Sequence, residues 1–563
     1  MLEEKEMDIK QLSFRIEYQV NNVKHLATGA ETEHFSLKTS LIDGKLSVTL
    51  CPKQSLSINR FTVKYPYSFK SDSRIYVNGY QSWTDSLEYR PDEQMSELST
   101  LTQFGVTKTP LRKIGVSESG DLNFHKYPRC NGVFYGWSYG YVRNGGDIDL
   151  FGSLSERSGY TTVTFDAGRN CVLIGKDLEG VIYSDNTEIL SFAFISDEYE
   201  NAFDRYFSLM GITCREHKKR TGYTTWYNYY GSVTYDVVKR DLESLSSIDA
   251  EIDCFQIDDG YQAAVGDWLI TDLKKFPDGM KAVADKIHSK GMTAGLWLAP
   301  FAGVKSSQLF KNHPDWFIKD ANGKPYKTGH NWGGFYSLDI YNKDAADYIR
   351  HVFDVVLNQW GYDLVKLDFL YGACVLPMHN KSRGEIMCDA MDLLRDCCGD
   401  KLILGCGVPL MPAFGKVDYC RIGSDIALNW HHRRHSTRED VSTPHAVSNT
   451  IFRRHLNGRA WMNDPDVFLL RDENIRMDFN RRKLLSRINS IFGSLLFVSD
   501  NVGKYDSKQL EALKKAFSKE NYNVISAGFI EPHIMEVKYS CENKTQTLVF
   551  DVWNGSVISD TAE

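Results

Sequence analysis

The sequence lacks the features that would assign it to a membrane, to a disulfide scaffold or to a nucleic-acid partner. No apolar run approaches the length of a membrane-spanning helix, and the opening segment MLEEKEMDIKQLSF has no apolar stretch after a basic patch. The 12 cysteines are scattered without paired spacing. The formal net charge of -7 provides no basic excess for nucleic acid or an anionic membrane. We therefore expect a cytoplasmic protein with reduced thiols and without a nucleic-acid or membrane partner.

The chain also lacks an internal repeat and a low-complexity tract. Its 563 residues exceed what one hydrophobic core organises, so two or three domains are expected. Hydrophobic residues make up 42% and charged residues 25%, which is ordinary for a globular protein. The aromatic content of 13% is high. It fits β-rich domains, and it also fits sites whose aromatic faces stack on sugars, so composition alone does not separate these two interpretations.

Short alternating runs at both ends of the chain predict β-domains. The first region, 1–214, contains the strand-like runs FRIEYQV, KLSVTLC, RFTVKY, TTVTFDA and CVLIGK, separated by clusters of Gly, Asn and Asp. Such a pattern predicts an N-terminal antiparallel β-sandwich. The last region, 506–563, contains NVISAGFI, IMEVKYS and TLVFDVWNG, which predict a small C-terminal β-domain.

The region between them, 215–505, has a different texture. Apolar runs alternate with amphipathic stretches of helical length, such as AADYIRHVFDVVLNQW. This pattern predicts an α/β fold, a (β/α)8 barrel, as the catalytic domain. The eight expected strands are 224–230, 253–258, 293–301, 362–371, 401–407, 417–425, 459–466 and 494–500.

Polar and aromatic side chains occur near the carboxyl ends of these expected strands. Functional residues of a (β/α)8 barrel lie at those ends, so these side chains should surround one cavity. Such a cup suits glycoside hydrolysis, which needs an ionised carboxylate, a protonated acid and groups that hold several hydroxyls. In chain order they are Trp226, Tyr227, Asn228, Asp258, Asp259, Trp297, Lys366, Asp368, Cys406, Arg421, Asp425, Asn463, Asp464 and Asp466.

Asp368 is the leading candidate for the reacting carboxylate. One residue separates it from Lys366, so on a strand both side chains point to the same face, and Leu367 and Phe369 point towards the helices. A lysine there would keep the carboxylate ionised. The pattern leaves other interpretations open, because Asp368 could cap the loop after its strand and Asp425 could be a helix N-cap.

Several motifs taken together resemble the glycoside hydrolase family 36 α-galactosidases. The resemblance covers nearly the whole chain, with the motifs in the same order and at strand ends. The family's layout is also a β-sandwich, a (β/α)8 barrel and a C-terminal β-domain. The motifs are NGYQSW, FQIDDGYQ, GDW, GLWLAPF, VKLDFLY, LGCGVPLMPAFG, CRIGSD and NDPD.

The resemblance implies a role for each matching residue and no metal or cofactor. Asp368 matches the nucleophile and Asp425 the general acid/base of a retaining double displacement. The substrate would be an oligosaccharide with terminal α-linked galactose. The positions implied to hold or line the sugar site are Asp258, Asp259, Lys366, Arg421, Trp297, Cys406 (near the 2-hydroxyl), Trp226, Tyr227 and Trp83, the last from the N-terminal domain.

One segment departs from the family pattern. After Arg421 and Ile422 we expect a Pro within G-P-D and then a Thr-Ala stretch, but the chain reads GSDIALNW. The acid/base assignment to Asp425 rests on the intact Arg-Ile-Gly anchor. The preference for the leaving group is left open, since this loop should line the subsite beyond the scissile bond.

Three other functions compete with an α-galactosidase. An α-N-acetylgalactosaminidase would use the same fold and mechanism, and would differ in the space near Cys406 and Arg421. A transglycosylase such as a raffinose synthase would need its acceptor to outcompete water. A non-catalytic carbohydrate-binding protein could keep the aromatic residues and the Asp258–Asp259 pair, but would have no reason to keep both Asp368 and Asp425.

A metal hydrolase is a more distant alternative. His431, His432 and His435 form a cluster that is compatible with metal spacing, but Arg433 and Arg434 would repel a cation and no H-E-x-x-H pattern is present. We prefer a basic helix face for this segment.

Four further residues have structural interpretations as well as functional ones. Trp268 could pack a loop or contact sugar, and Asp339 is expected to be structural. Asp466 is expected to support the loop of the seventh strand, and Trp332 is a candidate for the rim of the pocket.

Overall fold

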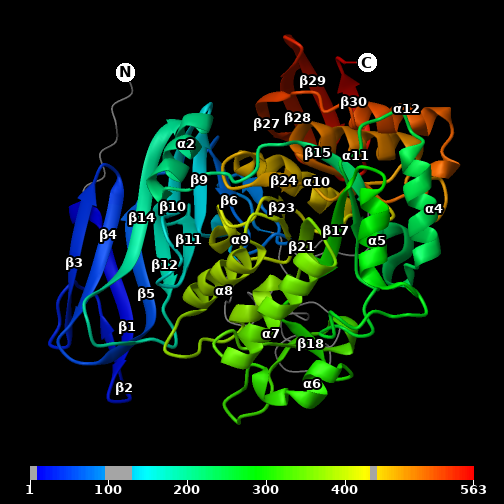
Figure 1. Ribbon diagram of the computed structural model, residues 1–563. Coiled ribbons are helices and arrows are strands. Elements are labelled where there is room, and N and C mark those ends of the chain that lie inside the picture. Colours follow the sequence, from blue (N-terminus) through cyan, green and yellow to red (C-terminus); the bar gives the residue numbers. More distant parts are fainter. Residues whose placement is uncertain (1–8, 96–129, 431–440, 563) are drawn as a thin grey trace.

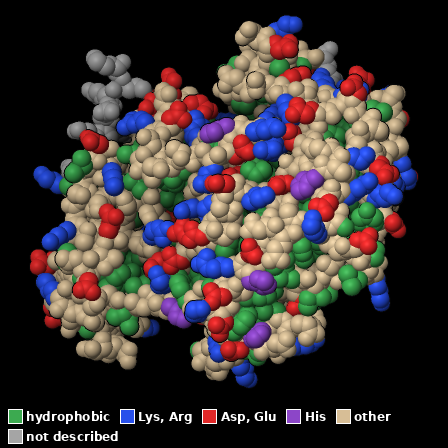
Figure 2. Space-filling view, viewed as in Figure 1, with side chains coloured by type: hydrophobic (Ala, Val, Ile, Leu, Met, Phe, Trp, Pro, Cys, Tyr) green, Lys and Arg blue, Asp and Glu red, His purple; other side chains and the backbone are tan. Residues whose placement is uncertain are grey.

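The computed structural model describes residues 9–95, 130–430 and 441–562. Figure 1 shows three parts that follow the chain: antiparallel strands, a central region of parallel strands and helices, and a small antiparallel sheet near the C-terminus. No helix in these ranges is both long and apolar enough to cross a membrane. Acidic and basic side chains are intermixed over the face shown in Figure 2.

The N-terminal part is built from two antiparallel sheets that share one hydrophobic core. The first sheet has the order β2-β1-β5-β12-β11-β8, with β13 beside β5. Its strands are β1 (Ser13–Val20), β2 (Val23–Ala27), β5 (Leu56–Pro66), β8 (Val133–Trp137), β11 (Tyr160–Asp166), β12 (Cys171–Asp177) and β13 (Ile182–Tyr183).

The second sheet has the order β3-β4-β14-β10-β9-β6-β7 and faces both the first sheet and the central region. The alternation of side chains along strand β6 shows this. Ile75 and Val77 belong to the core between the sheets, whereas Tyr76 belongs to the core of the central region. Helix α2 (Tyr199–Met210) follows its last strand. The strands are β3 (Phe35–Ile42), β4 (Lys45–Pro52), β6 (Arg74–Val77), β7 (Leu87–Tyr89), β9 (Tyr139–Asn144), β10 (Asp147–Ser153) and β14 (Thr187–Glu198).

The central part contains a curled parallel sheet with the order β24-β23-β22-β21-β17-β16-β15-β26-β25. Its two end segments, β24 and β25, are separated in the chain only by Pro465 and Asp466. Each of the eight expected strand regions overlaps a strand of this sheet. The segments are β15 (Arg220–Thr224), β16 (Cys254–Ile257), β17 (Thr293–Leu298), β21 (Leu364–Leu367), β22 (Leu402–Gly405), β23 (Tyr419–Arg421), β24 (Met462–Asp464), β25 (Val467–Phe468) and β26 (Leu495–Val498).

Helices and short loops connect these strands. A small antiparallel sheet, β18 (Ala302–Val304), β20 (Phe335–Ser337) and β19 (Lys327–Gly329), extends from the loop after β17. The helices are α3 (Trp226–Tyr229), α4 (Tyr235–Ser246), α5 (Gly279–His288), α6 (Gln308–Asn312), α7 (Lys343–Asp354), α8 (Arg383–Cys398), α9 (Leu410–Ala413), α10 (Thr443–Phe452), α11 (Phe479–Phe492) and α12 (Ser507–Ala516).

The C-terminal sheet has four antiparallel strands in sequence order: β27 (Asn523–Glu531), β28 (Ile534–Cys541), β29 (Lys544–Asp551) and β30 (Ser556–Asp560). Helix α12 precedes it and packs on α11, where the Ser490 hydroxyl donates to the Ala516 carbonyl at 3.4 Å. The domain boundaries near 214 and 505 stay predictions.

The position of the first parallel strand was predicted wrongly. The aromatic run 224–230 has high β-propensity, but the strand ends at Thr224 and α3 begins at Trp226. The N–H of Thr225 still donates to the Gln256 carbonyl at 3.2 Å, and the N–H of Tyr229 then donates back to the Thr225 carbonyl at 3.1 Å. The chain therefore turns into a helix directly at the carboxyl end of the strand.

The N-terminal part contacts the central sheet at the ends of its strands. The loop between β6 and β7 pairs with the segment after β22: the N–H of Ser82 donates to the Val408 carbonyl at 3.1 Å, and that of Leu410 to the Tyr80 carbonyl at 3.3 Å. This loop carries Trp83.

Candidate active site

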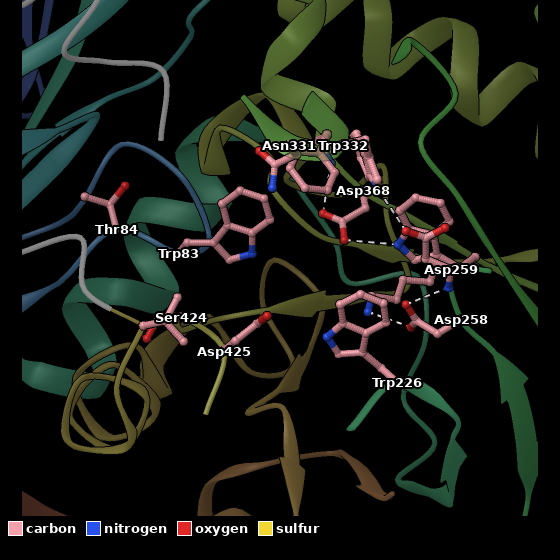
Figure 3. Close-up of a pocket in the computed structure, with 14 residues that line it drawn as sticks. Trp83, Thr84, Trp226, Asp258, Asp259, Asn331, Trp332, Asp368, Ser424 and Asp425 are labelled. Carbon is pink, nitrogen blue, oxygen red and sulfur yellow. Dashed lines mark hydrogen bonds and ion pairs between the residues drawn. The ribbon is translucent and has the colours of Figure 1, made fainter. Parts of the chain in front are cut away.

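A cavity of about 210 Å³ opens at the carboxyl ends of the parallel strands (Figure 3). In this view Asp368 and Asp425 approach the cavity from different sides, and the indoles of Trp83 and Trp226 border it. Nine residues that the sequence analysis expected at the site line this cavity, Trp83 from the N-terminal part and eight from the central part. The lining residues are Trp83, Thr84, Trp226, Asp258, Asp259, Trp297, Asn331, Trp332, Lys366, Asp368, Phe369, Ser424, Asp425 and Val441.

Asp368 is a buried carboxylate fixed by two N–H donors. The indole Nε1 of Trp297 donates to its Oδ2 at 3.1 Å, and the N–H of Phe369 donates to its Oδ1 at 2.8 Å. Burial raises the pKa of Asp368, while the positive charge of Lys366 and these two hydrogen bonds lower it. The carboxylate is therefore oriented by its two donors, and it lines the cavity.

Phe369 lies in the pocket, and the expectation that it points towards the helices was wrong. Its backbone is left-handed, with φ 54°, so the strand alternation stops at Leu367. The ring packs against the indoles of Trp83 at 5.1 Å and Trp332 at 4.7 Å between ring centroids. Such a conformation is uncommon for a bulky residue, and it places an aromatic wall beside Asp368.

Lys366 forms its direct ion pair with Asp258, with Nζ 2.9 Å from Oδ2. Burial opposes its charge, but Asp258 and Asp368 more than offset that effect and raise the pKa of Lys366. The Gln256 amide also donates to Asp258 Oδ2, at 2.7 Å. Lys366 is thus held as a cation between two carboxylates.

Asp259 accepts hydrogen bonds from two side chains, one of which, Trp332, lines the cavity. The indole Nε1 of Trp332 donates to its Oδ2 at 2.9 Å, and the Gln262 amide donates to its Oδ1 at 2.6 Å. Burial raises the pKa of Asp259, and these donors lower it. Trp332, expected as a rim candidate, therefore lines the pocket and orients a carboxylate.

Asp425 lies on the more open side of the pocket. Its side chain is 37% exposed, whereas Asp368 is 8% exposed as a residue. Arg421 donates to Asp425 Oδ1 at 2.9 Å and pairs with Asp466 Oδ1 at 3.3 Å. Asp466 also accepts from the N–H of Ile426 at 2.9 Å, so it supports the loop that carries Asp425.

Three expected sugar-binding residues do not line the cavity. Tyr227 is buried and its hydroxyl donates to Asp466. Arg421 is buried and occupied by two carboxylates. Cys406 is buried, and its N–H continues the strand ladder to the Leu367 carbonyl at 2.8 Å. Each of them lies behind the residues that form the surface of the pocket.

Other candidates from the sequence have structural positions. Trp268 is fully buried and packs on the indole of Trp297, with ring centroids 5.7 Å apart. Asp339 accepts from the N–H of Tyr341 at 3.0 Å and contacts His379 at 2.8 Å, as expected of a structural residue. The histidine cluster, His431, His432 and His435, lies outside the described residues.

Sequence reasoning did not single out Thr84, Asn331, Ser424 and Val441 as lining residues. Ser424 lies within the RIGSD motif and Thr84 directly follows NGYQSW, so both motifs carried a signal. Asn331 and Trp332 precede Gly333 and Gly334, which have φ of 79° and 122°. A glycine pair after an aromatic residue was the available sign of a sharp turn there.

The arrangement can hold a polyhydroxylated ligand with an apolar face. Carboxylates accept hydroxyl donors, Lys366 donates, and the indoles offer flat apolar surfaces. Two carboxylates that face one cavity from different strands, one buried and one more exposed, provide a nucleophile and a proton donor.

Comparison with known proteins points to one family. Residues 202–380 match the melibiase family model. The α-galactosidase of Escherichia coli is 33% identical over 151 residues, which are 26% of this chain and 20% of that protein. The A type blood α-D-galactosamine galactosaminidase of Flavonifractor plautii is 31% identical over 166 residues, 27% of this chain and 15% of that protein. The matched segments thus span a fifth or less of these two relatives.

A solved structure covers more of the chain. TtGalA, the α-galactosidase of Thermus thermophilus in complex with p-nitrophenyl α-D-galactopyranoside, superposes with a TM-score of 0.67 at 25% identity. The alignment covers 89% of this chain and 98% of that one.

Gly407 provides a test of how closely the site is packed. A Cβ added there would lie 2.8 Å from the N of Phe369, 2.9 Å from the indole of Trp83 and 3.0 Å from Asp368 Oδ1. Gly399 has nearly the same φ, 53° against 52°, but nothing within 4 Å. We expect Gly399→Ala to cost about 1 kcal/mol and Gly407→Ala about 1–3 kcal/mol more, because only the second adds a steric clash.

The midpoints of urea unfolding, followed by tryptophan fluorescence, would measure this difference. Equal losses of stability in the two variants would contradict the close packing of Trp83 and Asp368 around Gly407.

Proposed function

We propose that this chain is a member of the melibiase family of α-galactosidases (glycoside hydrolase family 36). In this proposal it is a retaining, exo-acting α-galactosidase that removes terminal α-linked galactose from oligosaccharides. The observation that carries the proposal is the pair Asp368 and Asp425, which face one cavity from the ends of different strands (Figure 3). The curled parallel sheet is then the family's (β/α)8 barrel, with its seventh strand divided at Pro465 and Asp466.

The first step forms a glycosyl-enzyme. The carboxylate of Asp368 attacks the anomeric carbon as the glycosidic C–O bond breaks, and the proton of Asp425 moves to the leaving oxygen. Trp297 and the backbone N–H of Phe369 hold Asp368 in place for this attack. Asp425 suits the proton transfer because its position on the open side is where the leaving sugar would extend.

The second step reverses the roles. Asp425, now a carboxylate, takes a proton from water, and the water oxygen bonds to the anomeric carbon as the bond to Asp368 breaks. Two inversions give net retention. The reaction uses neither a metal nor a cofactor.

The remaining residues divide into those that contact sugar and those that support them. We assign hydroxyl contacts to Asp258, Asp259 and Lys366, and apolar contacts to the surrounding aromatic side chains of the lining. We assign supporting roles to Arg421, Tyr227 and Cys406, because they lie behind the lining. Arg421 would orient Asp425 through the hydrogen bond to its Oδ1.

The proposal also covers the location of the protein and the sugar's 2-position. A cytoplasmic location is supported by the 12 cysteines, all within the described residues and all unpaired. A sugar with a nitrogen at the 2-position is the alternative substrate, supported by the name of the Flavonifractor plautii relative.

The identity of the sugar can be decided by parallel assays. We expect kcat/KM for p-nitrophenyl α-galactoside and raffinose to be at least about a hundredfold higher than kcat/KM for the α-galactosaminide and the α-N-acetylgalactosaminide. The reason is that a mismatched polar group commonly costs a few kcal/mol of transition-state binding. A reversed order would favour the alternative, and oligosaccharide products from raffinose alone would indicate a transglycosylase.

Asp368→Gly tests the nucleophile. We expect loss of at least about 10⁴-fold in kcat, and partial recovery with azide on an activated aryl galactoside, with β-galactosyl azide as the product, because azide can occupy the vacated space and attack the anomeric carbon. Asp339→Gly, a change away from the pocket, is the control. Proton NMR of the wild-type reaction should show α-galactose first, and β-galactose first would exclude retention.

The acidic limb of the pH profile should depend on Trp297. Its indole donates to the ionised form of Asp368, so Trp297→Phe removes an influence that lowers the pKa of Asp368. Since Asp368 must be deprotonated to attack, activity would be lost at higher pH than in the wild type. We expect the acidic limb of kcat/KM to move up by about 1 pH unit.

Trp268→Phe is the matched control, because this neighbouring indole packs on Trp297 and its Nε1 has no partner among the described residues. An equal shift in both variants would show that packing, and not the hydrogen bond, determines the pH of the acidic limb.

A further inference from the structure

Arg453 is a fully buried arginine next to the site that the proposed mechanism does not use. It directly follows α10, and its relative exposure is 0%. Its guanidinium donates to four backbone carbonyl oxygens. These acceptors are Ser82 at 2.7 Å and Ile422 at 2.9 Å from Nη1, and Thr84 at 2.8 Å and Gln81 at 3.1 Å from Nη2.

These acceptors belong to two neighbouring segments that both carry pocket residues (Figure 3). Ser82 and Thr84 flank Trp83 in the N-terminal part, and Ile422 lies between Arg421 and the loop of Asp425. Nη1 alone bridges Ser82 and Ile422. One planar group therefore joins the backbone beside Trp83 to the backbone beside the proposed proton donor.

Helix α10 adds a second connection one turn earlier. Asn449 accepts from the N–H of Ser86 at 2.7 Å and donates to the Thr84 carbonyl at 3.4 Å. A Cβ at Gly423 would lie 3.3 Å from the Asn449 side chain, so the loop of Asp425 packs directly on the same helix face. Residues at i and i+4 share a face of a helix, and this face holds both loops.

The bonding pattern favours a positioning role over a general stabilising one. Backbone carbonyls move only when their loops move, so hydrogen bonds to four of them fix loop geometry. The planar guanidinium of arginine, with five N–H donors in fixed directions, matches such an arrangement. A lysine ammonium has only three donors and is not planar. A displacement of about 1 Å at a catalytic group can cost about a hundredfold in rate.

We propose that Arg453 is a positioning residue that fixes Asp425 relative to Trp83 on one side of the pocket, so that the leaving group is protonated in the correct geometry. This inference rests on the proposed function. Its consequence is that the N-terminal β-domain helps to determine the efficiency of proton transfer, although the proton donor lies in the loop after β23 of the central part.

Arg453→Lys tests this inference, with Arg482→Lys as the matched control. Arg482 is also buried and donates to two backbone carbonyls, those of Leu470 and Arg471. It lies on α11, and neither of these acceptors is next to a residue that lines the cavity. A general loss of stability would affect both variants, whereas a positioning effect would affect only the first.

The kinetic readout is the dependence on the leaving group. For Arg453→Lys we expect kcat/KM to fall about a hundredfold on raffinose, whose leaving sugar needs the proton, and less than about tenfold on a dinitrophenyl galactoside, which does not. Arg482→Lys should show equal and small effects on both. Equal factors on both substrates in Arg453→Lys would overturn the proposal.

A second readout does not need the proposed activity. In protein labelled with 5-fluorotryptophan, the ¹⁹F resonance of Trp83 can be assigned through Trp83→Phe. It should shift in Arg453→Lys and stay in place in Arg482→Lys. An inactive wild type would refute the proposed function and leave this comparison intact, whereas an unmoved Trp83 resonance would refute the positioning role.

Asn449→Ala provides a milder variant should Arg453→Lys not fold. It removes the contacts to Ser86 and Thr84 but leaves the bond to Ile422. We expect the Trp83 resonance to shift. The ratio of kcat/KM on raffinose to kcat/KM on the dinitrophenyl galactoside should change at most about threefold, because the connection between Arg453 and the loop of Asp425 persists. An unchanged resonance would count against this helix face as the support of Trp83.

Discussion

The central constraint on this molecule is the need to keep several carboxylates together in a desolvated cavity. Burial raises the pKa of Asp368, Asp259 and Asp466, and close carboxylates add to that effect. Two buried cations oppose this rise in the pKa of the carboxylates. Lys366 pairs with Asp258 and is also attracted by the charge of Asp368, and Arg421 pairs with both Asp425 and Asp466. The site therefore has a half built around the lysine and a half built around the arginine, and each half contains one of the two proposed reacting groups.

Unusual backbone conformations place the side chains that these charges require. Phe369 and Trp332 each have φ of 54°, Gly407 has 52° and Asp466 has 78°. All four lie at the ends of parallel strands or in the loops beyond them, next to the cavity or directly behind it. In the three residues that are not glycine, such a conformation costs free energy that the surrounding packing must offset, and such conformations cluster at functional sites. Here they end the regular alternation of the strands and turn aromatic and acidic groups towards one point.

These same features set the limit of what could be predicted from the sequence. Periodicity located seven of the eight parallel strands and met the first only at its last residue. Motifs at the strand ends identified the cup, because both signals follow from local patterns. The helix at Trp226, the inward ring of Phe369 and the buried position of Tyr227 could not be derived this way, since each depends on a turn whose geometry is fixed by neighbours distant in the chain. Cys406 and Arg421 were placed at the correct edge of the sheet, but whether such a residue lines the cavity or supports the lining depends on packing depth, which a sequence does not encode. The boundaries of the domains and the chemical role of each site residue remain predictions.

The position of Trp83 shows why the N-terminal part belongs to the site and is more than a neighbour of it. Strand β6 places Ile75 and Val77 in one core and Tyr76 in the other, so the strand that precedes the Trp83 loop is fixed on both faces. The loop that follows is then bonded to the segment after β22 and to α10. Packing and hydrogen bonds thus fix this loop on folding, and little conformational entropy remains to be lost when a ligand binds. An indole on a free loop would have to be ordered at each binding event, whereas this one is already in place beside the proposed nucleophile.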